Sequence, residues 1–99
     1  MFEVLAEPNR RRILDLLLER ERPVGELVDE LGISQPAVSK HLRVLRDARL
    51  VDVTAAAQRR LYRVHAEPLR EIDDWLTPYR KAWGKRLDAL ERHLDEMPD

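Results

Sequence analysis

The stretch from Ile33 to Arg46 constrains the fold more than any other part of the chain, because it predicts a helix with two unlike faces. Val38, Leu42 and Leu45 follow one another at intervals of four and three residues, the spacing of a stripe that packs against a core. The other face holds an amide, a proline ring, a hydroxyl and two cations, with no acid before Asp47: Gln35, Pro36, Ser39, Lys40 and Arg43. Amides, hydroxyls and cations suit base edges and phosphate oxygens, so the pattern is typical of a helix that enters a DNA groove.

The residues just before this helix predict a second helix packed at a steep angle to it. The segment Val24–Leu31 carries inward leucines, and Gly32 is suited to ending a helix. Ser34 is a natural N-cap for the helix that follows, and Pro36 is tolerated in its first turn. A helix, a short turn that contains glycine and another helix form the helix-turn-helix arrangement.

A further helix is predicted upstream, beginning at Glu7-Pro8 and running to about Arg20, with a short helix at Phe2–Ala6 before it. Its apolar side is assigned to Ile13, Leu14, Leu16, Leu17 and Leu18. Three arginines, Arg10, Arg11 and Arg12, lie near its start, where positive charge opposes the helix dipole. We expect them either to contact phosphates or to pair with Glu7 or Asp15.

After Ala48 the apolar spacing changes to that of strands. Leu50, Val51 and Val53, and then Leu61, Tyr62 and Val64, form two β-rich runs separated by residues 54–60, so they predict a hairpin. Arg59 and Arg60 are placed at or beside its tip. A hairpin directly after a DNA-reading helix is a wing, and its basic tip suits phosphates or the minor groove.

The remainder, from Pro68 to about Glu96, predicts a long helix with Pro78 expected to kink or divide it near Thr77. Its apolar stripe repeats at close to 3.5 residues: Leu69, Ile72, Leu76, Tyr79, Trp83, Leu87, Leu90 and Leu94. One alternative is that the stripe packs on the chain's own first helices. The other, which we favour, is a dimer interface formed by residues 68–97 together with residues 1–7.

Charge is distributed unevenly along the sequence, although the formal net charge is only −1. Residues 34–63 hold seven basic and two acidic side chains, a net charge of +5, whereas the segments before and after each carry −3. This is the pattern of a polyanion-binding patch on an acidic body, although a solvated run of charges would look the same in composition.

Composition excludes several classes of protein. The chain has no cysteine, so disulfides and thiolate metal sites are ruled out. The sequence has no apolar run of membrane-spanning length and no signal-peptide pattern at its N-terminus, so we expect a cytoplasmic protein without a membrane partner. We also expect one domain over residues 1–99 and no enzyme, because no set of catalytic groups converges.

Four segments together resemble the ArsR-type winged helix-turn-helix repressors of bacteria. They are residues 7–14, residues 24–27, residues 34–45 (with the specific run SQPAVSKHLRVL from Ser34) and Leu61-Tyr62-Arg63. The resemblance implies a mainly helical winged helix-turn-helix fold with a small β-hairpin, and a homodimeric repressor joined through its first and last helices, often acting on its own operon. It places the base-reading positions on Gln35, Pro36, Ser39 and Lys40, with Ser34 and Arg43 near phosphates and Gln58, Arg59 and Arg60 in the wing.

The chain departs from the family pattern at several positions. Arg49 and Ala57 stand where many members carry glycine, so the wing must use a turn without positive φ or accept some strain. Val28 and Glu30 replace the cysteines of one family metal site, and alanine at position 82 replaces the upstream histidine of a second site that would include His93 and Glu96. We therefore expect no metal and no cofactor, and the residues point to no particular effector.

Taken together, the sequence predicts a dimeric, sequence-specific regulator of transcription that binds a pseudo-palindromic site on double-stranded DNA. The alternative from another class is a winged helix used as a protein-interaction module, with the C-terminal stripe as its docking surface. A ligand pocket around Trp75 and Tyr79 is left open.

Overall fold

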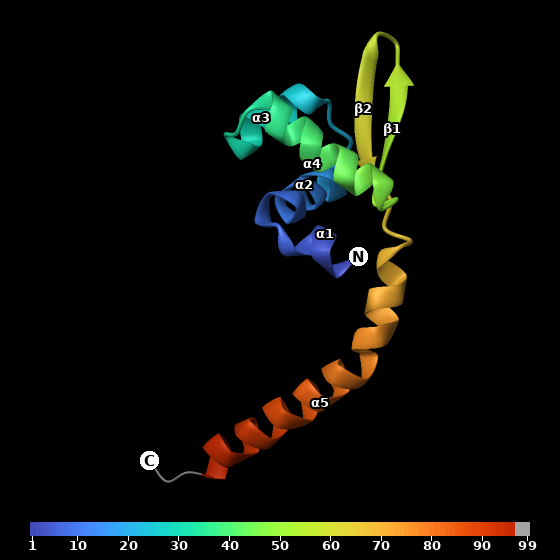
Figure 1. The fold of residues 1–99 in the computed structure, drawn as a ribbon. Coiled ribbons are helices and arrows are strands. Elements are labelled where there is room, and N and C mark those ends of the chain that lie inside the picture. The colour runs from blue at the N-terminus through green and yellow to red at the C-terminus, as the bar shows by residue number, and fades with distance from the viewer. Residues whose placement is uncertain (97–99) are drawn as a thin grey trace. The chain divides into compact units, whose positions relative to one another are not determined.

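In a computed structural model the chain is described over residues 1–96. The elements follow the order α1 (Phe2–Ala6), α2 (Pro8–Glu19), α3 (Val24–Leu31), α4 (Gln35–Asp47), β1 (Val51–Ala56), β2 (Arg59–Val64) and α5 (Leu69–Glu96). The chain divides into two compact units, residues 1–68 and the part from Leu69 onward. The mainly helical winged helix-turn-helix fold with one β-hairpin is confirmed (Figure 1).

The core of the first unit lies where α2, α3 and α4 meet the start of β1. Its buried apolar side chains are Ile13, Leu17, Leu27, Leu31, Val38, Leu42, Leu45, Leu50 and Val51. The prediction that Leu18 shares the apolar side of α2 is wrong, because this side chain is 73% exposed. Ile13 and Leu17 are one turn apart and face inward, and the next residue along a helix turns about 100° away from them.

A left-handed residue ends α4 and starts the wing. Arg49 has φ +62°, its N–H donates to the Arg46 carbonyl at 2.9 Å, and the Leu50 N–H donates to the Leu45 carbonyl at 2.9 Å. This pair of bonds is the Schellman motif, in which the left-handed position is usually glycine. Leu50, the residue after it, is fully buried, so the strained turn is what sends the chain back into the core.

The wing is a tighter hairpin than the sequence predicts. Its strands pair in antiparallel register from Val51 opposite Val64 to Ala56 opposite Arg59, which leaves a loop of only Ala57 and Gln58. The predicted separation over residues 54–60 is therefore too long, because backbone pairing continues through alanines that carry little strand signal. Ala57 has φ +56° and Gln58 does not have positive φ, the arrangement of a type II′ turn, which favours glycine first. Of the two predicted alternatives, the wing accepts strain.

A buried arginine fixes the base of the wing to the helices. Arg22 is 6% exposed, its Nε donates to the Leu16 carbonyl at 3.1 Å, and its Nη2 pairs with Glu19 at 2.7 Å. Its backbone also bonds β2 in both directions, donating to the Tyr62 carbonyl at 3.0 Å and accepting from the Tyr62 N–H at 2.9 Å. Tyr62 is thereby tied to the end of α2.

The second unit consists of α5, which runs through Pro78 without dividing. Proline removes the bond that its N–H would make to the Asp74 carbonyl. One residue before Asp74, the Asp73 carbonyl accepts from Thr77 Oγ1 at 3.2 Å and from Arg80 Nη2 at 2.8 Å. The ribbon changes direction in this part of α5 (Figure 1), as a mid-helix proline and a threonine bonded back to the preceding turn would produce.

We predict that Ala57→Gly and Arg49→Gly each stabilise the protein by about 1 kcal/mol, because glycine adopts positive φ without the steric cost of a Cβ. Chemical unfolding in urea, followed by circular dichroism, measures the difference.

The control is Ala55→Gly, which lies in β1 without positive φ and should destabilise the strand. An equal loss of stability in all three variants would mean that neither turn is strained.

Candidate nucleic-acid interface

The orientation of α4 is fixed by its cap and its buried stripe. The Ser34 Oγ accepts from the Ala37 N–H at 3.3 Å, which satisfies one of the free donors at the start of the helix. Gly32 has φ +68° at the end of α3, where the chain turns between the two helices. Val38, Leu42 and Leu45 are buried, so the opposite face of α4 points to solvent.

Every residue predicted to contact DNA from this helix is exposed: Ser34, Gln35, Pro36, Ser39, Lys40 and Arg43. They lie together on the outward side of α4, as their spacing requires. Arg59 and Arg60 are also exposed, at the start of β2.

The two wing arginines point to opposite faces of the hairpin, because side chains alternate along a strand. Arg60 shares its face with Tyr62, and Arg59 shares the other face with Arg63. Arg63 is held by Asp52, with its Nε 3.7 Å from the carboxylate. The face of the wing that carries Arg60 and Tyr62 lines a cavity together with α4.

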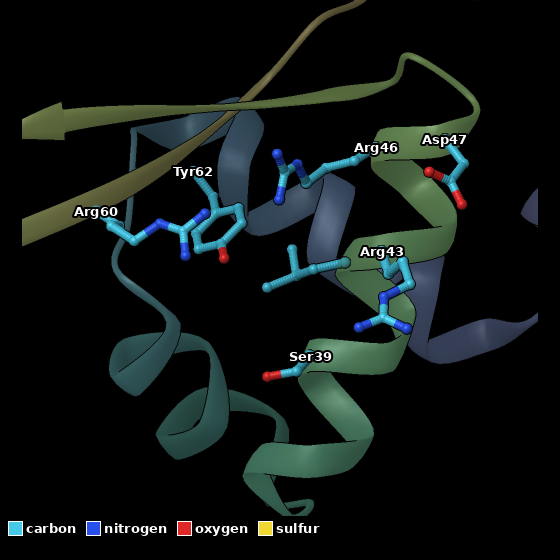
Figure 2. Close-up of a pocket in the computed structure, with 7 residues that line it drawn as sticks. Ser39, Arg43, Arg46, Asp47, Arg60 and Tyr62 are labelled. Carbon is cyan, nitrogen blue, oxygen red and sulfur yellow. The ribbon is translucent and has the colours of Figure 1, made fainter.

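A cavity of about 560 Å³ lies where that side of β2 faces α4. Figure 2 shows its polar side chains reaching from both elements. The lining residues are Ser39, Leu42, Arg43, Arg46, Asp47, Arg60 and Tyr62. Arg46 and Tyr62 are not among the residues predicted to contact DNA, although Arg46 continues the helical spacing of Ser39 and Arg43, and Tyr62 follows Arg60 by one strand period.

The basic side chains of the first unit fall into two groups. Arg10, Arg11, Arg12, Arg20, Arg22 and Arg63 all bond to protein atoms. Within residues 1–96, no hydrogen bond or ion pair involves the side chains of Lys40, Arg43, Arg46, Arg49, Arg59 and Arg60. The unpaired cations thus belong to α4, the turn that follows it and β2, where they raise the local positive potential.

Arg10, on α2, connects this helix to α4 and α1. Its Nε donates to His41 Nδ1 on α4 at 3.3 Å, and its Nη1 donates to the carbonyls of Glu3 at 3.5 Å and Val4 at 3.3 Å on α1. On the other side of the ring, His41 Nε2 lies 3.6 Å from Glu7 Oε2. His41 is thus a partly buried contact between helices, next to the buried Leu42 on α4.

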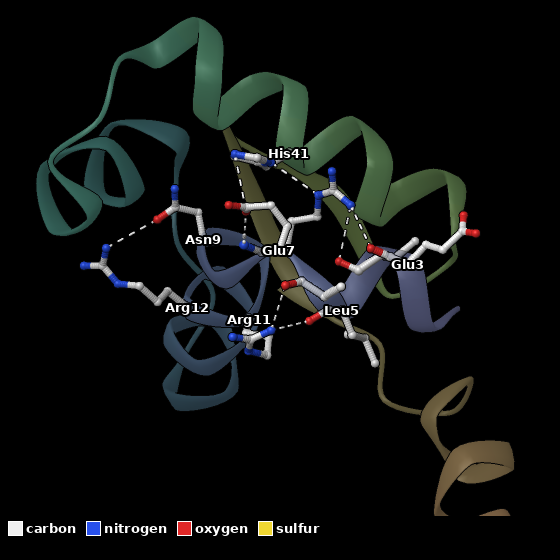
Figure 3. A network of polar contacts seen from close by, with 10 residues as sticks. Glu3, Leu5, Glu7, Asn9, Arg11, Arg12 and His41 are labelled. Carbon is white, nitrogen blue, oxygen red and sulfur yellow. Dashed lines mark hydrogen bonds and ion pairs between the residues drawn. The ribbon is translucent and has the colours of Figure 1, made fainter.

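The other two arginines of this run also act within the fold (Figure 3). Arg11 Nη1 donates to the carbonyls of Leu5 at 2.6 Å and Ala6 at 3.1 Å, at the end of α1. Arg12 donates to Asn9 Oδ1 at 3.4 Å and to the Glu30 carbonyl at 3.2 Å. The expected ion pairs with Glu7 or Asp15 are not found for these three guanidinium groups within residues 1–96, because helix-end carbonyls need donors and lie within reach.

The apolar stripe of α5 presents large side chains to solvent in the single chain. Trp75, Tyr79 and Trp83 are about half exposed, as are Leu87, Leu90 and Leu94. The rings of Trp75 and Tyr79 lie 4.9 Å apart, in a tilted contact within the helix. An apolar stripe of this length on one helix indicates a surface meant for burial.

Residues 1–96 contain no cluster of three or more histidine or acidic side chains arranged to hold a metal ion. None of the helices in this range combines the length and the hydropathy needed to cross a bilayer.

Comparisons with known proteins agree with this geometry. The model of a family described as bacterial regulatory protein, arsR family, matches residues 7–53. The chain is 35% identical over 98 residues to the HTH-type transcriptional regulator Rv2034 of Mycobacterium tuberculosis, spanning 99% of this chain and 89% of that protein. It is 29% identical over 76 residues to the transcriptional repressor SdpR of Bacillus subtilis, with 77% and 84% covered.

Among solved structures, an ArsR-like transcriptional regulator from Rhodococcus sp. RHA1 superimposes with a TM-score of 0.71 at 26% identity, covering 97% of this chain and 91% of that one. The family and these relatives are regulators of transcription, not enzymes.

We predict that Arg10 and His41 are energetically coupled. Arg10→Ala and His41→Ala should each destabilise the fold by about 1 kcal/mol, and the double variant should lose less than the sum, because one hydrogen bond is removed in both cases. Urea unfolding of the four proteins of this cycle gives the coupling energy.

Arg12→Ala provides the matched control, since Arg12 shares no partner with His41. Its effect should add to that of His41→Ala; purely additive losses for Arg10→Ala as well would show that the bond contributes nothing.

Proposed function

Because the chain belongs to the arsR family of bacterial regulatory proteins and is a DNA-binding transcriptional regulator, we propose that it acts as a homodimeric repressor on a pseudo-palindromic operator. The observation that carries the proposal is the gathering of unpaired cations and small polar groups on the exposed face of α4 and on β2. The site of action is the cytoplasm, where bacterial DNA lies.

In this proposal α4 enters the major groove with its first turns against base edges. Gln35 offers an amide that can bond adenine in a bidentate manner, and Lys40 can donate to guanine. Pro36 and Ser39 complete the base-facing surface. Ser34 and Arg43 lie toward the flanking phosphates, and Arg59 and Arg60 extend the contact along the backbone from the wing.

A dimer supplies the two-fold symmetry. The stripe of α5, from Leu69 to Leu94, would pack against its copy, with residues 1–7 beside it, and residues 68–97 would form most of the interface. Support comes from the exposure of the large apolar side chains on α5 and of Phe2 on α1, which a partner would remove from water. Two α4 helices would then read major grooves about 34–36 Å apart.

Repression follows from occupancy of such an operator, and binding to the chain's own promoter would make the protein autoregulatory. The name of the Bacillus subtilis relative, a transcriptional repressor, favours this direction of control. The alternative, a winged helix that binds protein instead of DNA, predicts an apolar or acidic outer face on α4. That face carries Lys40 and Arg43 and no exposed large hydrophobic side chain, so the alternative is disfavoured.

We predict that substitutions on α4 lower the discrimination between DNA sequences, whereas substitutions on the wing lower the affinity for all sequences. Gln35→Ala and Lys40→Ala should each cost about 1–3 kcal/mol of discrimination, because they remove contacts to bases. Arg59→Ala and Arg60→Ala should weaken all sequences alike and lower the slope of log K against log salt by about 0.9 each. Competition binding across a salt series, with an operator selected from fragments that the purified protein retains, measures both quantities.

Random duplex DNA serves as the reference for each variant. Equal losses on operator and random DNA for all four substitutions would refute this division of roles, and no shift of any duplex in a gel would refute the proposed function.

We predict that Leu90→Glu disrupts the dimer, because a buried carboxylate would face its own copy across the interface. Sedimentation equilibrium should give a dimer for the natural chain and a monomer for the variant, with weaker operator binding.

Arg92→Glu is the matched control, since it introduces the same carboxylate two residues away on the opposite side of α5, with a charge change of −2 instead of −1. Its mass should remain that of the dimer; a natural chain that sediments as a monomer would contradict the proposed assembly.

A further inference from the structure

The cavity between α4 and β2 is built from cations and hydroxyls. Three guanidinium groups line it, from Arg43, Arg46 and Arg60, together with the phenol of Tyr62 and the hydroxyl of Ser39. Asp47 is the one acid in the lining, so positive charge dominates. Figure 2 shows Ser39 and Arg46 of α4 extending toward the side where Arg60 and Tyr62 of β2 lie.

None of these donors is used inside the protein. Within residues 1–96, no hydrogen bond or ion pair is found for the guanidinium groups of the three arginines or for the Tyr62 hydroxyl. Arginine forks bind phosphate oxygens in a bidentate manner, and a neutral phenol can donate one more hydrogen bond. The chemistry that fits the cavity is therefore a phosphate group.

We propose that this cavity seats a backbone phosphate of the bound DNA, and that Arg46 and Tyr62 are contact residues in addition to those read from the sequence. The inference rests on the proposed function, because it concerns the same DNA-bound state. We call the cavity the phosphate cradle.

Both walls of the cradle are attached to α2. Tyr62 is bonded through its backbone in both directions to Arg22, whose side chain is buried at the end of α2. The other wall, α4, is packed through Val38, Leu42 and Leu45 and is bonded through His41 to Arg10 on α2. A preformed site binds without first having to order its walls.

Such a site would set the register of the recognition helix. Phosphate contacts fix how a protein lies along the duplex, and base contacts are read from that position. One wall of the cradle belongs to α4 and the other to the wing. A backbone phosphate bound between them would therefore hold both elements against the same DNA strand at a fixed spacing. Arg46 and Tyr62 act on every sequence alike.

The cavity is large enough for a backbone phosphate. A water molecule takes about 30 Å³ of liquid volume, so about 560 Å³ is more than a bare phosphate ion fills and has room for a sugar–phosphate unit. Inorganic phosphate has the same donor requirements, and the experiment must separate the two sources.

The test compares operator and mixed-sequence duplex DNA by fluorescence anisotropy over a sodium chloride series. Arg46→Ala should lower affinity about tenfold on both duplexes and lower the salt slope by about 0.9. Arg46→Lys should keep the slope, since the charge remains. Tyr62→Phe should lower affinity several-fold on both duplexes with the slope unchanged, because the phenol is neutral.

Arg63→Ala is the matched control. It removes an arginine from the residue next to Tyr62, but on the opposite face of β2 and already paired with Asp52. Its affinity and slope should match those of the natural chain. Thermal unfolding of each variant verifies that it is folded before binding is compared.

Wild-type affinity in either Arg46→Ala or Tyr62→Phe overturns the proposal while leaving DNA binding by the natural chain intact. Failure of the natural chain to bind any duplex refutes the proposed function instead. In a last arm, inorganic phosphate replaces chloride at constant ionic strength. If inorganic phosphate stabilises the natural chain but not Arg46→Ala against thermal unfolding, and yet leaves the affinity of the natural chain for DNA unchanged, the assignment is overturned, because the cradle then takes a free anion and not the DNA backbone.

Discussion

The packing of one apolar stripe on α4 is the interaction on which the rest of the structure depends. Val38, Leu42 and Leu45 are buried against the first unit's core, each contributing about 1.5–3 kcal/mol of transfer free energy. Rotation of α4 by a single residue, about 100°, would expose that stripe and bury Lys40 or Arg43. The burial therefore decides which side chains face outward, and the DNA-reading surface is the complement of the core contact.

The use of arginine follows from this arrangement. Near the chain start, guanidinium groups donate to carbonyls at the ends of α1 and α3 and fasten α4 through His41. On α4 the only acid is Asp47. The basic side chains from Lys40 to Arg60 find no partner within residues 1–96. One residue type thus has two roles, separated by whether helix-end carbonyls or carboxylates lie within reach. The formal net charge of −1 conceals this division.

Backbone strain marks the two turns that position the wing. Arg49 and Ala57 hold positive φ without being glycine, at a cost of order 1–3 kcal/mol each. At position 49, a glycine would relieve the strain but would also remove one of the unpaired cations beside the recognition helix. At position 57 no such exchange is visible, and nothing in the structure explains the alanine.

The sequence by itself determined the element order, the capped recognition helix and which side chains of α4 face outward. These features depend on local spacing and capping chemistry that a linear pattern records. The sequence also left two alternatives for the wing turn and for Arg10, Arg11 and Arg12. Tertiary structure decided the first, since φ at Ala57 shows which turn the wing adopts. For the three arginines it shows bonds that neither alternative named, to helix-end carbonyls and to His41, because the nearest acceptors of a guanidinium depend on how distant segments pack. Arg46 and Tyr62 likewise came together only in three dimensions, because α4 and β2 form a common cavity once Arg22 holds the strand to the end of α2.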